Sequence, residues 1–254
     1  MKFKHHALAA LALGLIAGAT QAAATSEVSY TSLNGTVITF SELADGVSID
    51  GLLTSGGVQF GERFVGQELA VTKAPLPGSM TQQEWFDDLG NGSPTAGLTL
   101  LAGATGANLG AYDYGDAHGT ALFGVGPLAS SADGFGAISA RFASPVSALG
   151  FQLRDVDYGA VTLSLYRLDG SLIQNVDLGG RTDQFGDLFV AFTRTGGTAD
   201  IAGFSLTNVD SRFGVSLDNL VLAAPVPEPA SALLMLPGLL ALGLVARRRS
   251  SKTQ

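Results

Sequence analysis

VTLSLYRL (residues 161 to 168) and SLIQNVDL (residues 171 to 178) stand on either side of the pair Asp169-Gly170. In the first segment Val161, Leu163 and Leu165 alternate with other residues, which is the period-two pattern of a strand that has one face on a core. Asp-Gly between two strand-like segments favours a two-residue type I′ turn, in which both residues need a positive φ. The stretch therefore predicts a β-hairpin and indicates an antiparallel β protein.

The same alternation extends over the second half of the chain. Leu149, Phe151 and Leu153 share one parity, while Gln152 and Arg154 have the other. Clusters of Gly, Asn and Asp separate the strand-like segments, as in a β-sandwich. Further strands are expected at residues 138–142, 187–194, 201–206 and 215–222 in this half, and at 36–40, 58–65 and 98–101 in the first half.

Two local features break the pattern. The apolar parity shifts between Leu217 and Leu220, which predicts a β-bulge near Asp218-Asn219. In the first half the spacing of Thr81 and Glu84 is that of a helix capping box. Trp85, Phe86 and Leu89 would form the apolar side of that helix and Gly90 its end, so one short helix is expected there.

Composition supports an all-β body and excludes several classes of partner and site. The chain has 34 glycines, only 14% charged residues and no cysteine, so disulfides, thiolate metal sites and a cysteine nucleophile are excluded. Of the formal net charge of −8, the two ends carry +5, which leaves −13 on residues 25–224. A nucleic-acid binder needs clustered Lys and Arg, so DNA and RNA are not expected as partners.

Residues 1–24 have the plan of a secretory signal peptide. Lys2 and Lys4 give a basic start, an apolar run follows, and Ala22 and Ala24 fit the A-x-A cleavage pattern. Signal peptidase is therefore an expected processing enzyme. The folded body is expected at residues 25–224.

Residues 225–254 have the order of a sorting signal. Pro227-Glu228-Pro229 comes first, an apolar segment suited to a single transmembrane helix follows, and Arg247, Arg248 and Arg249 come last. The arginines should stop transfer and remain on the cytoplasmic side, which places the body across the membrane. The alternative is an ordinary C-terminal anchor behind a stiff linker.

This end resembles the PEP-CTERM sorting signal of Gram-negative bacteria. The resemblance implies recognition through Pro227, Glu228 and Pro229 by exosortase, an integral-membrane cysteine protease. It further implies an intermediate anchored in the inner membrane, followed by transfer to the cell surface or release outside the cell. Each proline fixes φ, so the tripeptide is expected to be extended and able to bind in a protease groove.

The body itself resembles, more loosely, the β-sandwich domains that often precede this tag. The residues that carry the resemblance are Ile38-Thr39-Phe40, Gly57-Val58-Gln59-Phe60 and Leu217-Asp218-Asn219-Leu220. It implies a jelly-roll related to carbohydrate-binding modules and brings no established ligand with it. By the same analogy, Glu42 and Asp218 are candidate calcium ligands, and no other cofactor is expected.

Evidence for catalysis is sparse in the sequence. His118 is the only histidine of the body, and no nucleophile motif accompanies it, so a surface loop is the expected setting. Asp155 and Asp157 lack the remainder of a calcium loop. Trp85, Tyr112, Tyr114 and Tyr158 could form a platform on which sugars stack, although a core position is the alternative for Trp85.

The leading functional hypothesis is a non-enzymatic, exported surface or matrix protein associated with extracellular polysaccharide. A secreted glycan hydrolase is the second hypothesis, and it would require two carboxyl groups roughly 5 to 10 Å apart in a cleft. An adhesive or ice-binding surface is the third, and the regular threonine repeat that would favour it is absent from the sequence.

Overall fold

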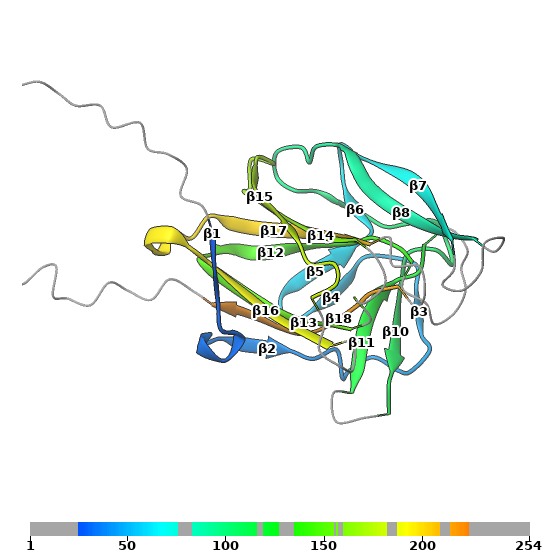
Figure 1. Ribbon diagram of the computed structural model, residues 1–254, viewed down its shortest axis with the longest axis horizontal. Coiled ribbons are helices and arrows are strands. Elements are labelled where there is room, and N and C mark those ends of the chain that lie inside the picture. Colours follow the sequence, from blue (N-terminus) through cyan, green and yellow to red (C-terminus); the bar gives the residue numbers. More distant parts are fainter. Residues whose placement is uncertain are drawn as a thin grey trace, which may run out of the picture.

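The structure, a computed structural model, describes residues 25–75, 83–115, 119–126, 135–154, 156, 160–181, 187–208 and 214–223; of residues 71–75, 83–87 and 208 it describes the backbone alone. Two antiparallel sheets lie face to face and enclose the core (Figure 1). The all-β prediction is therefore confirmed for the described residues.

Sheet A contains the strands nearest to both ends of the described chain. β18 runs through its centre and pairs with β13 on one side and with β11 and β2 on the other. In spatial order the strands are β1 (Thr25–Val28), β16 (Asp187–Arg194), β13 (Ala148–Arg154), β18 (Ser216–Ala223), β11 (Thr120–Gly124), β10 (Leu109–Asp113) and β3 (Ser48–Ile49), with β2 (Thr36–Ile38) beside β18.

Sheet B forms the second layer. Its strands are, in order, β15 (Leu172–Asp177), β14 (Val161–Tyr166), β17 (Ile201–Asn208), β12 (Ile138–Val146), β5 (Val58–Gly61) and β4 (Leu53–Ser55). From β11 onward the chain crosses between the sheets at almost every connection, because consecutive strands belong to opposite layers except for the β14–β15 hairpin.

The core lies between the two sheets and follows the predicted parity. Phe151 and Leu153 of sheet A and Leu163 and Phe204 of sheet B are fully buried there. The rings of Phe151 and Phe204 pack across the interface with centroids 5.7 Å apart. Each such side chain contributes roughly 1.5–3 kcal/mol by leaving water, so alternation on the central strands is enough to hold the layers together.

The hairpin predicted around Asp169-Gly170 is confirmed, but its turn is of another type. β14 and β15 are paired, and the loop has three residues, Leu168 to Gly170, closed by hydrogen bonds from Arg167 N to Ser171 O (2.9 Å) and from Gly170 N to Arg167 O (3.0 Å). Gly170 has a φ of 84°, whereas Asp169 does not have a positive φ. This is the three-residue arrangement with a glycine in the left-handed region, not a type I′ turn.

The predicted β-bulge in the last strand is also confirmed. Gly150 pairs with Val221 and Gln152 with Asp218, so β18 has one residue more than β13 between these pairs. Asn219, with a φ of 50°, occupies the bulge. The extra residue returns Leu220 to the core side, which explains the parity shift in the sequence.

The short helix predicted from Thr81 to Gly90 is wrong. Residues Gln83–Gly92 form strand β8, which pairs with β7 (Gln67–Pro75) in a two-stranded antiparallel sheet. The hydrogen bonds of this long hairpin outweigh the local preference for a capped helix turn. Besides the strands, the described residues contain two 3₁₀ turns, η1 (Tyr30–Ser32) and η2 (Thr195–Gly197).

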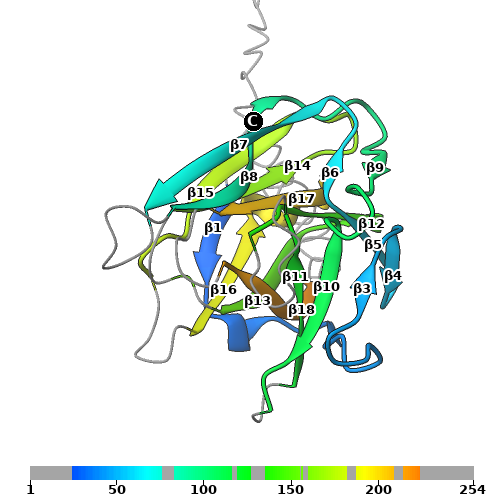
Figure 2. The same cartoon turned by 90° about the vertical axis from the view of Figure 1, so that its right-hand side faces the viewer.

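One segment, described over residues 62–75 and 83–101, crosses the outer face of sheet B. It contains the β7–β8 hairpin and the small pair β6 (Arg63–Phe64) and β9 (Leu100–Leu101). Figure 2 shows β7 and β8 above β14, β15 and β17. Phe64, Leu98, Leu100, Tyr166 and Ala202 form a second, smaller apolar cluster beneath this strap, so the strap is fixed to the sheet.

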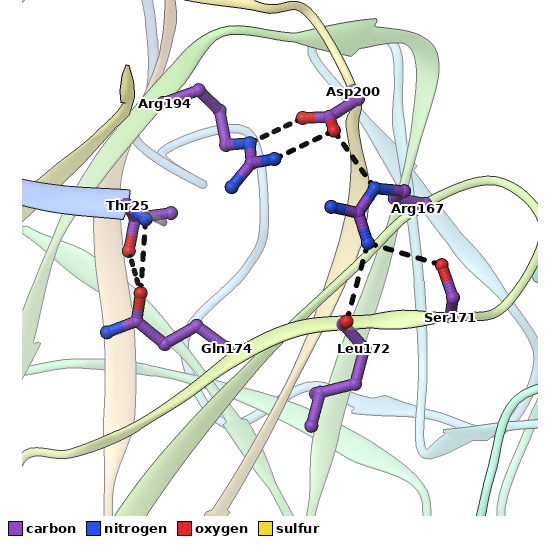
Figure 3. A network of polar contacts seen from close by, with 7 residues as sticks. All are labelled: Thr25, Arg167, Ser171, Leu172, Gln174, Arg194 and Asp200. Carbon is purple, nitrogen blue, oxygen red and sulfur yellow. Dashed lines mark hydrogen bonds and ion pairs between the residues drawn. The ribbon is translucent and has the colours of Figure 1, made fainter. Parts of the chain in front are cut away.

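A polar network closes one end of the sandwich (Figure 3). Asp200 accepts hydrogen bonds from Arg194 at the end of β16 (2.6 and 2.9 Å) and from Arg167, directly before the hairpin loop (3.0 Å). Beside it, the backbone N–H of Thr25 donates to the side-chain carbonyl of Gln174 (3.2 Å), which joins the edge strands of the two sheets. Ala148 pairs with both Thr193 and Ala223, so β18 finishes at this same end.

Within the described residues there is no helix with the length and apolarity needed to span a membrane. The predicted C-terminal helix, like the signal peptide, lies outside these residues.

Candidate functional site

A row of small polar side chains crosses the outer face of sheet B. Val161, Leu163 and Leu165 of β14 face the core, so the residues between them, Thr162 and Ser164, face outward. The strand register places Ser164 between Asn175 of β15 and Ser205 of β17, and places Ser205 beside Ser139 of β12. The pair Thr162 and Thr207 lies parallel to this row.

The strap covers one half of the row. Ser139 and Ser205 share a hydrogen bond of 2.8 Å, and Ser205 also donates to the side-chain carbonyl of Gln67 at 3.2 Å. The same Gln67 oxygen accepts from the N–H of Phe64 (2.8 Å), and its nitrogen donates to the hydroxyl of Tyr166 (3.2 Å). These buried groups are satisfied within the protein, so this half is structural.

The other half of the row stays open as a groove of about 220 Å³ between β8 and sheet B. β8 and the loop after it supply one wall, β14 and β17 the floor, and β15 the second wall. The lining residues are Asp88, Leu89, Gly90, Gly92, Ser93, Thr162, Ser164, Tyr166, Leu172, Asn175 and Thr207.

The lining is suited to a ligand that carries several hydroxyl groups. The hydroxyl of Ser164 donates to the amide oxygen of Asn175 at 2.9 Å, while the amide nitrogen of Asn175 makes no hydrogen bond to described residues. Serine and threonine hydroxyls both donate and accept, so the row can match a ligand hydroxyl in either role. Leu89 and Leu172 add apolar contact at the walls.

Tyr166 stands where the open and covered halves of the row meet. Burial raises the pKa of its hydroxyl, and hydrogen bonds with Ser164, Gln67 and Ser205 oppose that rise. Its ring packs edge-on against Phe64 with centroids 5.9 Å apart. The phenol therefore remains neutral at physiological pH and holds the end of the groove in place.

The predicted aromatic platform is only partly assembled. Tyr112 and Tyr114 meet edge to face with centroids 5.0 Å apart, near one end of sheet A. The guanidinium of Arg154 covers a face of Tyr114 at 3.8 Å, and the Tyr114 hydroxyl is 2.9 Å from that of Ser216. Because that face is already occupied by Arg154, it is not available for stacking a sugar.

The other two members of that platform contribute nothing to this site. The structure gives Trp85 a backbone position on β8 opposite Lys73, which corrects the helical position predicted for it, and its side chain is outside the description. Tyr158 lies outside the described residues altogether.

The two candidate calcium ligands have separate hydrogen-bond partners. Asp218 is completely buried and accepts from the N–H (2.6 Å) and the side-chain amide (3.1 Å) of Asn219, whose amide also donates to Gln152 (2.7 Å). Glu42 accepts from the hydroxyl of Ser55. Among the described residues, no group of three or more His, Asp or Glu side chains is arranged to hold a metal ion.

Several predicted site residues lie outside the described part of the chain. They are Ala22 and Ala24, Pro227, Glu228 and Pro229, Arg247, Arg248 and Arg249, and also His118, Asp155 and Asp157.

No family model matches the chain, and no curated protein does. Solved structures that align with parts of it include two carbohydrate-binding modules. One, from a study described as "Binding sub-site dissection of a family 6 carbohydrate-binding module", has 7% identity and a TM-score of 0.29, and the alignment covers 46% of this chain and 82% of the other. The second is CsCBM6-3 from Clostridium stercorarium in complex with cellobiose, with 10% identity, a TM-score of 0.25 and coverage of 63% and 88%. Similarity at this level supports no argument about this chain.

The groove residues were missed by sequence reasoning, although the sequence contained a signal. Hydroxyl residues occupy the outward positions of β14 and β17, where alternation was used only to find the core. What the sequence lacked was the position of β8, which brings Asp88 beside strands more than 70 residues away in the chain.

Proposed function

We propose that the chain is an exported protein, sorted and cleaved through its C-terminal PEP-CTERM tag, whose body binds extracellular polysaccharide in the groove under β8. The support for binding is the open hydroxyl row with its amide and carboxylate neighbours. The support for export is the signal peptide pattern and the Pro-Glu-Pro, apolar and arginine segments of the sequence. The alternation of consecutive strands between layers supports the jelly-roll arrangement inferred for the body.

The position of the groove suits a body tethered by its C-terminus. Thr25 and Ala223 lie at the end where β17 begins, since Val146 pairs with Ile201 and Ala148 with Ala223. Thr207 is six residues further along β17, or about 20 Å at the rise of a strand. The groove reaches from Tyr166 and Leu172, near the end where Ala223 lies, to Thr207, so a ligand can approach it from the side away from a tether attached after Ala223.

Binding is favoured over hydrolysis by the carboxylates of the groove. A glycoside hydrolase requires a pair of carboxyl groups on either side of the bond to be cleaved. Asp88 is the only carboxylate among the described residues that line the groove. We therefore propose a non-catalytic role.

The binding proposal is tested by removing hydroxyl groups from the floor. Ser164→Ala combined with Thr207→Val keeps the shape of the groove and deletes two hydrogen-bonding groups, each worth about 0.5–1.5 kcal/mol, so affinity should fall roughly tenfold. The measurement is a glycan array with the secreted protein, followed by calorimetry with the oligosaccharide that binds best. Thr198→Val, an exposed threonine next to η2, is the matched control. Failure of the unmodified protein to bind any glycan, or equal affinity of double variant and control, would refute glycan binding in the groove.

The sorting proposal is tested at Glu228. The signal peptide drives translocation and the apolar segment with its arginines stops it, so Glu228→Ala should leave export intact. Loss of a charge-assisted hydrogen bond to the processing enzyme costs roughly 1.5–3 kcal/mol, a tenfold to hundredfold loss in recognition, and precursor should accumulate in the membrane. Immunoblots of membrane and medium fractions measure this. Equal release of both proteins would make Glu228 part of a linker.

A further inference from the structure

The groove contains a carboxylate that no cation of the described chain neutralises. Asp88 of β8 is half-buried at the wall of the groove and makes no ion pair or hydrogen bond with another described residue apart from the pairing of its backbone with Ala70. No Lys or Arg is among the described lining residues. The carboxylate lies along the backbone of Gly90, where a β-carbon would come within 3.2 Å of Oδ2.

The surroundings of this carboxylate define the ligand that would match it. The hydroxyl groups of Thr162, Ser164 and Thr207 and the free amide nitrogen of Asn175 are neutral hydrogen-bonding groups and can recognise ring hydroxyls. An ionised carboxylate beside them gains most from a cationic donor, because charge-assisted hydrogen bonds are about twice as strong as neutral ones. It disfavours an anionic sugar by the same Coulomb interaction.

The charge of the whole body acts in the same direction. Residues 25–224 carry −13, so a polyanionic glycan is repelled before it reaches the groove and a polycation is attracted. This long-range effect is screened by salt, whereas the contact with Asp88 in the groove is screened less.

We infer that the groove selects amino sugars with a free ammonium group, with Asp88 as the residue that determines this selectivity. Neutral sugars of the same shape then bind more weakly, and uronic-acid polymers are rejected. The inference rests on the proposed function and specifies its ligand class.

The test compares three glycans that differ in charge. The protein recovered from the medium is titrated by calorimetry with oligomers of glucosamine, of N-acetylglucosamine and of glucuronic acid, at low and at high salt. Affinity should be highest for the glucosamine oligomer, lower for the N-acetylglucosamine oligomer and lowest for the glucuronic acid oligomer. Asp88→Asn should weaken binding of the glucosamine oligomer roughly tenfold to hundredfold and leave the acetylated oligomer nearly unchanged. Asp88→Lys should reverse the order and create binding of the glucuronic acid oligomer.

A charge-matched control separates the contact in the groove from the overall field. Glu27→Gln removes one negative charge from β1 of sheet A, outside the lining of the groove, where Glu27 forms an ion pair with Arg181, and should change glucosamine binding only at low salt. The inference is overturned if Glu27→Gln and Asp88→Asn weaken glucosamine binding equally. It is also overturned if the Asp88 variants bind the three glycans in the same order of affinity as the unmodified protein. Either result would leave the proposal of glycan binding in the groove intact. If none of the glycans binds the unmodified protein, here or on the array, the proposed function fails as well. Unchanged melting temperatures of the variants confirm that the comparison concerns binding.

Discussion

Glu62 is a carboxylic acid buried where β5 ends and β6 begins. It is 4% exposed, its N–H donates to Leu101 O at 3.0 Å, and its carbonyl accepts from Ser139 at 3.1 Å. Burial raises the pKa of its side chain, and the adjacent Arg63, which forms an ion pair with it, opposes that rise. The position of the backbone therefore forces a charge into an environment that disfavours it.

The sign of the pH dependence follows from that raised pKa. In the interval that starts near the ordinary value of 4.5 and extends upward, the folded chain binds more protons than the unfolded chain. The contribution of Glu62 to the free energy of unfolding is thus fully present below this interval and is lost as the pH rises through it. Glu62→Gln should remove this loss, so the variant gains stability relative to the unmodified protein as the pH rises above 4.5.

Urea unfolding at a series of pH values measures this difference. Glu68→Gln, an exposed acid on β7, is the control and should leave the pH profile unchanged. If Glu62→Gln has the same profile as the unmodified protein, Glu62 does not carry the pH dependence described.

At the scale of elements, the β14–β15 hairpin joins sheet B to the strap. Gly170 has a φ of 84°, and a β-carbon there would come within 2.3 Å of the carbonyl oxygen of Pro94. The loop is further held by a hydrogen bond from Gly97 N to Leu168 O (2.7 Å). The turn thus serves as a contact surface as well as a reversal of the chain.

Gly170→Ala should therefore be costly. A left-handed φ in a non-glycine residue and the clash with Pro94 together should reduce the free energy of unfolding by about 1–3 kcal/mol. Asp169→Ala at the exposed neighbouring position, which removes the hydrogen bond from Ser171 N (2.9 Å), should have the smaller effect. Chemical denaturation measures the free energy of unfolding of both variants. If Gly170→Ala loses no more of it than Asp169→Ala, neither the left-handed φ of Gly170 nor its contact with Pro94 is important.

The elements that sequence reasoning predicted are those whose identity depends on burial alone. Leu163 and Phe204 face the core at every second position, so their strands were predictable. The same reasoning predicted the bulge, because the displaced Leu220 still has to face the core. The residues of β8 were predicted as a helix because they form a strand by pairing with β7, and the local sequence does not reveal that partner.

The candidate site was less predictable than the fold for a related reason. Its floor is encoded by outward hydroxyls such as Ser164 and Thr207, which resemble ordinary surface residues. Only the strap makes them a groove, and it does so through contacts between distant parts of the chain. One face of Tyr114, which was predicted to stack against sugars, is covered for the same reason, because Arg154 reaches it from β13.

At the scale of the whole molecule, the two layers are joined differently at their two ends. Near the termini Asp200 links Arg194 of sheet A to Arg167 of sheet B, and Gln174 receives Thr25 (Figure 3). The groove begins beside this network at Tyr166 and Leu172 and extends along β17 to Thr207, where no comparable network closes it among the described residues. The polar network thus joins the two layers where the described chain begins and ends, and the open surface of the groove starts directly beside it.

The central position of β18 in sheet A also governs when the body can fold. Synthesis proceeds from the N-terminus, so Ser216–Ala223 is made last although β13, β11 and β2 all pair with it. Before it emerges, these strands have unpaired edges that can join other chains. Sheet A therefore cannot be completed before the whole body has been made, and pairings this remote in the chain are typical of topologies that fold in roughly milliseconds to seconds. A nascent chain of this protein consequently lacks the central strand of sheet A until Ser216–Ala223 has been made, whereas every strand of sheet B is already present.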